Sequence, residues 1–297
     1  MNFLNQNSGW LGLPPGSSWE AENNSLDLNP FIEYRKLLWS YHLATSQGMS
    51  DQNFLDVVKN LDDAVSELTG TGFRETPLVF LSELSKAIGQ DGGVWAKNET
   101  INVSGSHKAR HLFGLALRLE IEEVSKNKPL TIASCGNAAL AASVIAKAAK
   151  RNLTVNVPTW ADTSLLDGLS DYGARIQICE RRNGESGDPC MLRFKELLEE
   201  GALPFGCQGT ENIWTIDGGK TLGFEMSTQL NRYDLEPDRL LVQVGGGALA
   251  SSTMQALTDA KNFGILKNRP SLNTVQASGC SPLLIAFNQI SDSDNPS

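Results

Sequence analysis

The sequence contains a lysine in a setting where an amine can take part in covalent chemistry. Lys108 follows the turn-forming stretch Asn-Val-Ser-Gly-Ser and His107, and an apolar helical pattern continues after it. It lies in the first turn of that expected helix, where the helix dipole disfavours a cation with a purely structural role. A position of this kind suits a lysine that forms a Schiff base. Taken alone, a lysine in this setting is usually an ordinary solvated residue, so the rest of the chain has to decide.

A second candidate is the glycine run Gly245, Gly246 and Gly247, which joins an apolar strand pattern over 240–244 to a helical pattern. Glycines let backbone N–H groups approach an anion, and a helix N-terminus adds free donors and partial positive charge. We therefore expect a phosphate group here.

Three interpretations of this run compete. The Gly-Lys-Ser/Thr of a Walker A loop is absent. The run fits the dinucleotide fingerprint G-x-G-x-x-A, but the next strand pattern, TVQAS (274–278), offers no carboxylate for a ribose. A site for a phosphate monoester and a glycine turn without a ligand remain as alternatives.

The third candidate is the junction IASCGNAALAAS (132–143), where a strand pattern ends in Ser134 and a helix opens after Gly136. Ligands of open α/β sheets bind outside the carboxyl ends of strands, at junctions of this kind. The alternative is that Asn137 only caps the helix.

These candidates need a scaffold of alternating strands and helices. Strand patterns occupy 130–134, 154–158, 175–179, 240–244 and 274–278, with helical patterns between them. Such alternation predicts β-α-β crossovers and a largely parallel sheet. Before it come an irregular, unpacked arm over 1–29, a helix over 29–44 that begins near Pro30, and a helix over 51–68 with Asp51 as N-cap.

The composition and the sequence argue against several classes of binding partner. The net charge of −9 over 297 residues argues against a nucleic-acid partner. The five cysteines lack a C-x-x-C pair and the three histidines lack zinc-motif spacing, so no metal is expected. No secretory signal and no apolar run of about 18 residues is present, which predicts no membrane contact and, by default, a cytoplasmic protein.

Six segments, in matching order, resemble motifs of the fold-type II pyridoxal-phosphate enzymes, the tryptophan-synthase-β-like superfamily, and are most similar to threonine synthase and its relatives. The segments are GFRETPLVFL (72–81), KNETINVSGSHKAR (97–110), SCGNAALA (134–141), IDGGKTLGFEM (216–226), VGGGALAS (244–251) and VQASGCSPL (275–283). The resemblance implies an α/β fold with parallel-rich open sheets flanked by helices, in two domains.

In that arrangement residues 71–110 plus 205–297 would form the cofactor domain, which we expect to be incomplete at its C-terminal end. Residues 111–204 would form a smaller mobile domain, and 1–70 an arm with helices. Family members carry a further strand whose Ser, Thr or Cys contacts the pyridine nitrogen, and the resemblance places the end of this chain before that strand.

The resemblance also implies roles. Lys108 would form the Schiff base with pyridoxal 5′-phosphate and move protons, and Asn137 would hydrogen-bond the 3′-oxygen of the cofactor. The phosphate would lie on Gly245, Gly246, Gly247, Ala248 and Leu249. The substrate carboxylate would face Ser134, Gly136 and Ala138.

The chain departs from the family pattern where His107 replaces the usual Phe beside the ring, and where Val103-Ser104 replaces Pro-Thr. The function implied is β-elimination or β-replacement on an amino acid, threonine-synthase-like or ammonia-lyase-like, in an enzyme compatible with a homodimer. The alternatives are a non-catalytic relative that serves as a binding or regulatory protein and, more distantly, a dinucleotide-binding oxidoreductase.

Overall fold

The computed structural model describes residues 11–20 and 29–291. The helices are α1 (Pro30–Glu33), α2 (Trp39–Ser46), α3 (Asp51–Thr69), α4 (Ser82–Ala87), α5 (Lys108–Ile121), α6 (Asn137–Ala148), α7 (Thr163–Asp171), α8 (Pro189–Glu199), α9 (Thr215–Arg232), α10 (Ala248–Asn262) and α11 (Pro282–Ser291), with 3-10 turns η1 (Arg35–Leu37) and η2 (Val103–Gly105). The strands are β1 (Leu78–Phe80), β2 (Trp95–Lys97), β3 (Leu130–Ala133), β4 (Leu153–Pro158), β5 (Arg175–Cys179), β6 (Leu203–Pro204), β7 (Arg239–Gln243) and β8 (Ser271–Val275).

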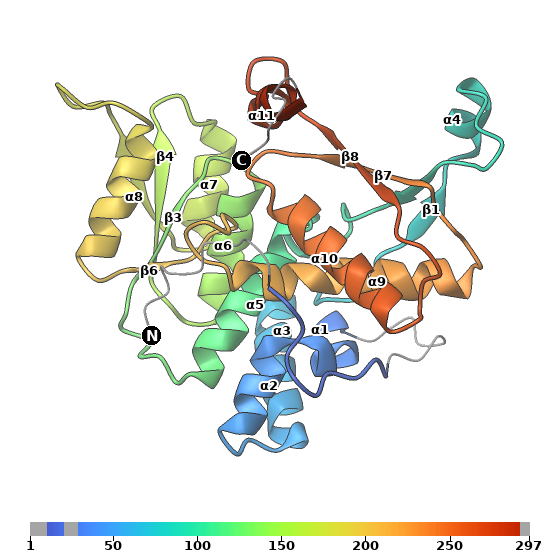
Figure 1. Cartoon of the computed structure of the whole chain (residues 1–297). Coiled ribbons are helices and arrows are strands. Elements are labelled where there is room, and N and C mark those ends of the chain that lie inside the picture. The colour runs from blue at the N-terminus through green and yellow to red at the C-terminus, as the bar shows by residue number, and fades with distance from the viewer. Residues whose placement is uncertain (1–10, 21–28, 292–297) are drawn as a thin grey trace.

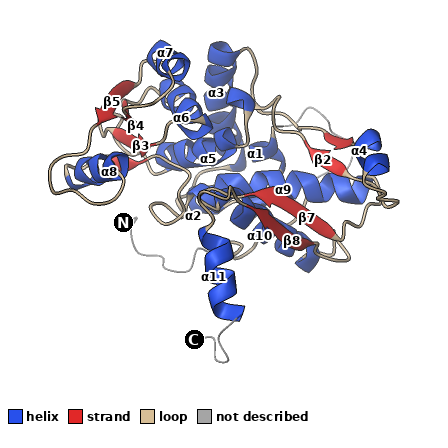
Figure 2. Ribbon diagram, turned by 90° about the horizontal axis from the view of Figure 1, so that it is seen from above, coloured by secondary structure: helices blue, strands red, loops and turns tan. Residues whose placement is uncertain are grey.

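The alternating middle of the chain forms a four-stranded parallel sheet in the order β5-β4-β3-β6, which confirms the predicted parallel pairing. Helix α8 covers one face of this sheet, and α6 and α7 cover the other (Figure 2). The inner strand β3 is buried on both faces because helices pack on each side of it. The result is the α/β layering that the sequence predicts.

Two further strand pairs lie on the other side of the molecule (Figure 1). Strands β7 and β8 are parallel, as predicted, and rest against α10, but β8 begins three residues before the predicted strand 274–278 and ends at Val275. Strands β1 and β2 form an antiparallel pair that we did not predict, because each has only three residues and neither alternates clearly between buried and exposed positions.

Helix α9 lies in the centre, packed against α5 on one side and α10 on the other. Three glycines of α9, Gly218, Gly219 and Gly223, make this close approach possible. A Cβ at Gly218 would lie 2.3 Å from the carbonyl oxygen of Arg110, and one at Gly223 would lie 2.6 Å from Cβ of Ala256. The glycines of the segment 216–226 are therefore spacers that let three helices pack backbone to backbone.

The prediction of one continuous helix over 29–44 is wrong, because the structure divides this segment into separate helices. Leu38 is extended (φ −99°, ψ 136°), so α1 and η1 end before it and α2 begins at Trp39. The cause is tertiary, because the carboxylate of Asp217 on α9 accepts hydrogen bonds from the backbone N–H groups of Trp39 (2.9 Å) and Ser40 (3.0 Å). Burial raises the pKa of Asp217, and these two donors act in the opposite direction.

Two smaller predictions in this region are also corrected. Ser50, not Asp51, caps α3, and its hydroxyl accepts from the N–H of Asn53. The described part of the arm, 11–20, contains no helix or strand, as expected, yet it packs. Leu11 is buried, its N–H donates to Gln255, and its carbonyl accepts from Lys220. The rest of the arm up to residue 28 and the closing 292–297 lie outside the described residues.

Candidate active site

All three candidate motifs stand at helix starts. Helix α5 begins at Lys108, α6 at Asn137 and α10 at Ala248. None of their N-cap residues makes a side-chain capping bond; these are His107, Gly136 and Gly247. The first N–H groups of a helix have no partner within it, so the starts of α6 and α10 keep donors for another group, while the N–H of Lys108 lies 3.4 Å from Oγ of Ser106.

The starts of α5 and α10 are brought together through Gly219 on α9. A Cβ at Gly219 would lie 2.2 Å from Cε1 of His111 and 2.9 Å from Oγ of Ser252. His111 lies three residues after Lys108, and Ser252 lies in the second turn of α10. The helix that carries the lysine and the helix that follows the glycine run therefore meet at this glycine, while α6 packs against α5 and η2.

The glycine run forms an open loop. Val242 and Val244 are buried and anchor the strand side, whereas Gly245 and Gly246 are exposed. Gly247 has φ 84°, a left-handed conformation that favours glycine. A Cβ added at any of the three glycines would meet no atom within 4 Å among the described residues. The loop thus borders free space in front of the start of α10, as an anion site requires.

The amine of Lys108 differs from two other interior lysines. Lys97 is paired with Glu225, and Nζ of Lys220 lies 2.6 Å from Oδ2 of Asp259. Within the part of the chain that the structure describes, no hydrogen-bond acceptor or carboxylate contacts Nζ of Lys108, although its side chain is half-buried. Lys108 is therefore the interior amine among these three that is not held in an ion pair.

Two histidines with lowered pKa values lie near this amine. Burial, together with the Lys108 cation, lowers the pKa of His107 to about 4, and burial lowers the pKa of His111 to about 3. The Nδ1–H of His111 donates to the carbonyl of Thr215 at 2.8 Å. Nε2 of His107 is buried and has no hydrogen-bond partner. An orphaned buried nitrogen beside Lys108 is a polar group that can bind a ligand.

Sequence reasoning missed one neighbour of this amine. Cys207, on the segment between β6 and α9, is buried, and burial raises the pKa of its thiol to about 11 despite the nearby Lys108 cation. It lies about 100 residues along the chain from Lys108 and belongs to none of the six motifs, so no pattern could have placed it there.

At the third junction, Asn137 is exposed and is the first residue of α6, so the alternative that it only caps the helix is wrong. The N-cap is Gly136, whose extended backbone (φ −154°) exposes the helix start. Ser134 is fixed at the strand end by a backbone bond to Asn156, and Ala138 is half-buried behind Asn137.

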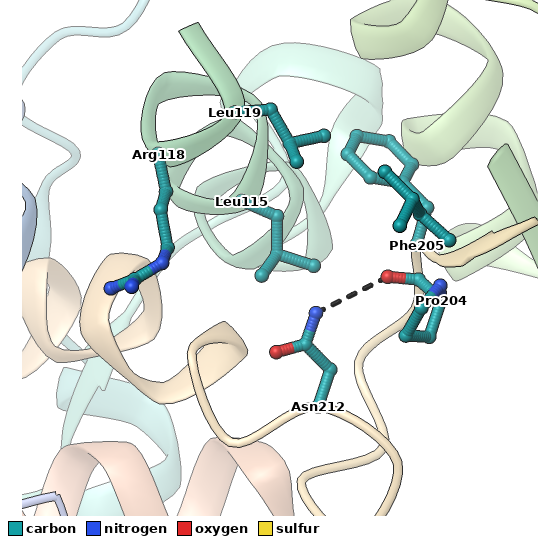
Figure 3. Close-up of a pocket in the computed structure, with 7 residues that line it drawn as sticks. Leu115, Arg118, Leu119, Pro204, Phe205 and Asn212 are labelled. Atoms are coloured by element: carbon teal, nitrogen blue, oxygen red, sulfur yellow. Dashed lines mark hydrogen bonds between the residues drawn. The ribbon is translucent and has the colours of Figure 1, made fainter. Parts of the chain in front are cut away.

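The small cavity drawn in Figure 3 is a different place. It has a volume of about 10 Å³ and lies between the middle of α5 and β6, where Leu115, Arg118 and Asn212 contribute to its wall. That volume is about the space of one water molecule, so the cavity cannot hold a cofactor.

Two further findings concern the described residues. Within 11–20 and 29–291, no group of three or more His, Cys, Asp or Glu side chains is arranged to hold a metal ion. In the same residues, every helix is too short or too polar for a membrane span.

An α/β fold in which a lysine, an asparagine and a glycine loop each stand at a helix start is consistent with a fold-type II pyridoxal-phosphate enzyme. A family model for pyridoxal-phosphate-dependent enzymes matches residues 70–295, and the chain belongs to that family, whose members use pyridoxal 5′-phosphate.

The relatives agree with this assignment. The chain is 25% identical to a threonine synthase of Synechocystis sp. over 210 residues (70% of this chain and 52% of that protein). It is 27% identical to a biosynthetic L-threonine dehydratase of Staphylococcus epidermidis over 194 residues (65% and 44%). The chain thus spans about half the length of the curated relatives that it matches.

The solved structures support the fold. Threonine deaminase isoform 2 from Solanum lycopersicum aligns with a TM-score of 0.60 at 18% identity, covering 81% of this chain and 60% of that one. At this identity the likeness shows the fold alone.

The residues present fit pyridoxal phosphate. The open glycine loop and the uncapped start of α10 suit a phosphate, and the unpaired amine of Lys108 suits an aldehyde. The buried, unpartnered Nε2 of His107 adds a polar contact that no described residue satisfies.

Proposed function

We propose that this chain belongs to an enzyme of β-elimination or β-replacement on a small amino acid, of the kind named in its threonine synthase and threonine dehydratase relatives. The observation that carries the proposal is the amine of Lys108, which is half-buried, is held by no carboxylate of residues 11–20 and 29–291, and lies on the helix that meets α10 at Gly219. The other interior lysines, Lys97 and Lys220, are neutralised in ion pairs and are not free for chemistry.

The residues at the three helix starts would divide the work. The backbone N–H groups of Gly245–Leu249 would bind the phosphate, and the exposed amide of Asn137 would donate to the 3′-oxygen of the cofactor. The amine of Lys108 would take the proton from the substrate Cα and return it at the β-position. When bound, the pyridine ring supplies an electron sink for the carbanion at Cα.

The substrate carboxylate would lie at the start of α6. The segment Ser134–Ala138 offers backbone N–H groups and the Ser134 hydroxyl there, and the helix dipole favours an anion. His107 would face the cofactor as a neutral imidazole, because its pKa of about 4 keeps it uncharged near neutral pH. The homodimer and the cytoplasmic location expected from the sequence stay predictions.

The test is chemical. The chain is incubated with pyridoxal phosphate, reduced with borohydride and mapped by peptide mass spectrometry. We expect the pyridoxyl mass on the peptide that contains Lys108, with Lys97 and Lys220 as internal controls that stay unmodified. Lys108→Ala should lose the modification. Label on the control lysines, or label spread over surface lysines, would contradict the proposal.

A second measurement separates the alternatives. Unreduced protein that has bound pyridoxal phosphate is mixed with serine, threonine, O-phosphohomoserine or diaminopropionate. Release of ammonia, phosphate or a keto acid is then followed. Turnover of one of these supports the enzyme. Modification at Lys108 without any turnover would instead favour the non-catalytic binding protein.

A further inference from the structure

We propose that Glu99 is a positioning residue for Lys108. It would act by holding both ends of the loop 99–110 in one ion-pair network. The inference rests on the proposed function of Lys108 and concerns a residue of the segment 97–110 to which the resemblance assigns no role. The network consists of Glu99, Arg110, Glu225, Lys97 and Thr76, and is called the Arg110 network below.

Arg110 is the centre of this network. Its guanidinium is fully buried and donates to both oxygens of Glu99, from Nε and Nη2, at 2.9 Å each. It also donates to both oxygens of Glu225 on α9, at 2.9 and 3.2 Å. A bidentate guanidinium–carboxylate pair fixes orientation as well as distance. Because Lys108 lies two residues before Arg110 on α5, this fixes the turn that carries the amine.

The charges of the network balance. Lys97, at the end of β2, is paired with Glu225 and donates to the carbonyl of Thr76 at 2.6 Å. Two cations and two carboxylates are thus buried together. Burial alone would raise the pKa of Glu99, but Arg110, Thr76 and Lys97 together hold that pKa at about 2. Glu99 therefore stays ionised and keeps accepting from Arg110 throughout the neutral range.

Glu99 makes a second attachment that an ion pair by itself would not require. Its Oε2 also accepts from Nδ2 of Asn102 at 2.8 Å, and Oδ1 of Asn102 caps the turn η2 by accepting from the N–H of Val103. That turn contains Ser104 in the left-handed region (φ 55°), a conformation that costs a non-glycine residue energy. One carboxylate thus clamps the turn before Lys108 and the helix after it.

The consequence is specific to the amine. Loosening Glu99 would let the segment 102–108 relax from its strained turn, which would move Lys108 relative to the glycine loop on α10. The phosphate contacts of Gly245–Leu249 would remain, because α10 is not part of the Arg110 network. The covalent step at Lys108 should then slow, whereas the affinity for the cofactor should not change.

The test compares Glu99→Gln with a matched control on the same helix. Glu122→Gln breaks the ion pair with Arg118 at the far end of α5, where both side chains are also largely buried. Each variant is mixed with saturating pyridoxal phosphate and quenched with borohydride at intervals. Bond formation joins Nζ of Lys108 to the aldehyde carbon with loss of water, and borohydride adds hydride to that carbon, so the trapped peptide reports the rate.

We expect Glu99→Gln to slow trapping at least about tenfold, since a displacement of about 1 Å can cost about a hundredfold. Its dissociation constant for pyridoxal phosphate, measured in the Lys108→Ala background, should stay within about twofold of the parent. Glu122→Gln should change neither quantity. If Glu99→Gln fails to fold, Asn102→Ala removes only the clamp on the turn and should slow trapping about threefold or more.

Equal slowing by Glu99→Gln and Glu122→Gln would overturn the proposal, because it would show a general loss of stability. No slowing by Glu99→Gln would overturn it as well. Amide hydrogen exchange of residues 102–108, measured without cofactor, provides an independent reading, and Glu99→Gln should speed it while Glu122→Gln does not. If the parent chain is not trapped at Lys108, the proposed function fails, and unchanged exchange would then overturn the clamp too.

Discussion

The two ends of helix α5 use the same residue types in different ways. Near the start, Arg110 binds Glu99 and Glu225, which come from two other segments of the chain. Near the end, Arg118 binds Glu122 one turn away on the same helix border and lies 3.6 Å above the ring of Trp214. The first pairing joins distant segments, whereas the second is mostly local.

This difference shows where the molecule places its rigid contacts. A local (i, i+4) pair contributes only a few tenths of a kcal/mol to a helix. A buried network cannot lose one member without leaving another charge unpaired. The buried network around Arg110 lies next to Lys108. Arg118, which forms the local pair, lines a small cavity to which we assign no role (Figure 3).

The largest effect should come from removing the two arginines in turn. Arg110→Met leaves Glu99 and Glu225 buried with Lys97 as their remaining cation, and we expect it to lower the free energy of unfolding by about 3–5 kcal/mol. Arg118→Met loses a local pair and a cation–π contact, for about 1–2 kcal/mol. Urea denaturation measures both, and equal losses would remove the distinction between the two ends.

Lowering the pH should destabilise the start of α5, where two buried histidines lie. The pKa of His107 is lowered to about 4 and that of His111 to about 3, from 6.5 in both cases. The unfolded chain therefore binds more protons than the folded chain below about pH 6.5, and stability is lost as pH falls toward the folded pKa values. From about pH 7 to about pH 5 each histidine should contribute a loss of about 2 kcal/mol.

The comparison of His107→Phe with the parent chain checks this. Between about pH 7 and about pH 5, the free energy of unfolding of the variant should fall by about 2 kcal/mol less than that of the parent chain, which is the contribution of one histidine. Urea denaturation at each pH measures this difference. An unchanged pH dependence would mean that His107 is charged or exposed in the folded state.

A smaller effect is expected where α5 meets α10. Gly219→Ala would place a Cβ 2.2 Å from His111, and overpacking of this kind costs about 1–3 kcal/mol. Gly168→Ala on α7 is the matched control, because its Cβ would meet only Leu140 at 3.8 Å. Alanine is the better helix former by about 1 kcal/mol, so the control should be neutral or stabilising. Thermal unfolding of both variants decides, and a stabilised Gly219→Ala would refute the spacer role.

Much of the scaffold could be predicted from the sequence. The parallel strands β3, β4, β5, β7 and β8 and the helices between them follow from local apolar patterns and glycine punctuation, and these are confirmed. The predictions that failed depend on distant contacts. The break before Trp39 depends on Asp217, and the packing of Leu11 depends on Lys220 and Gln255. The domain boundaries and the roles of the individual site residues stay predictions.

By itself the sequence determined that Lys108, Asn137 and the three glycines each stand where a strand or turn ends and a helix begins, because that is a local property of the chain. Their roles in chemistry stay predictions. Only the tertiary structure decided which of the three interior lysines, Lys97, Lys108 and Lys220, are held in ion pairs among the described residues. Lys97 and Lys220 look as ordinary as Lys108 in the sequence, yet carboxylates from distant segments hold both of them. The physical reason is that an ion pair depends on distance in space, and the fold places β2 with Lys97 and α10 with Asp259 next to α9, which carries Glu225 and Lys220.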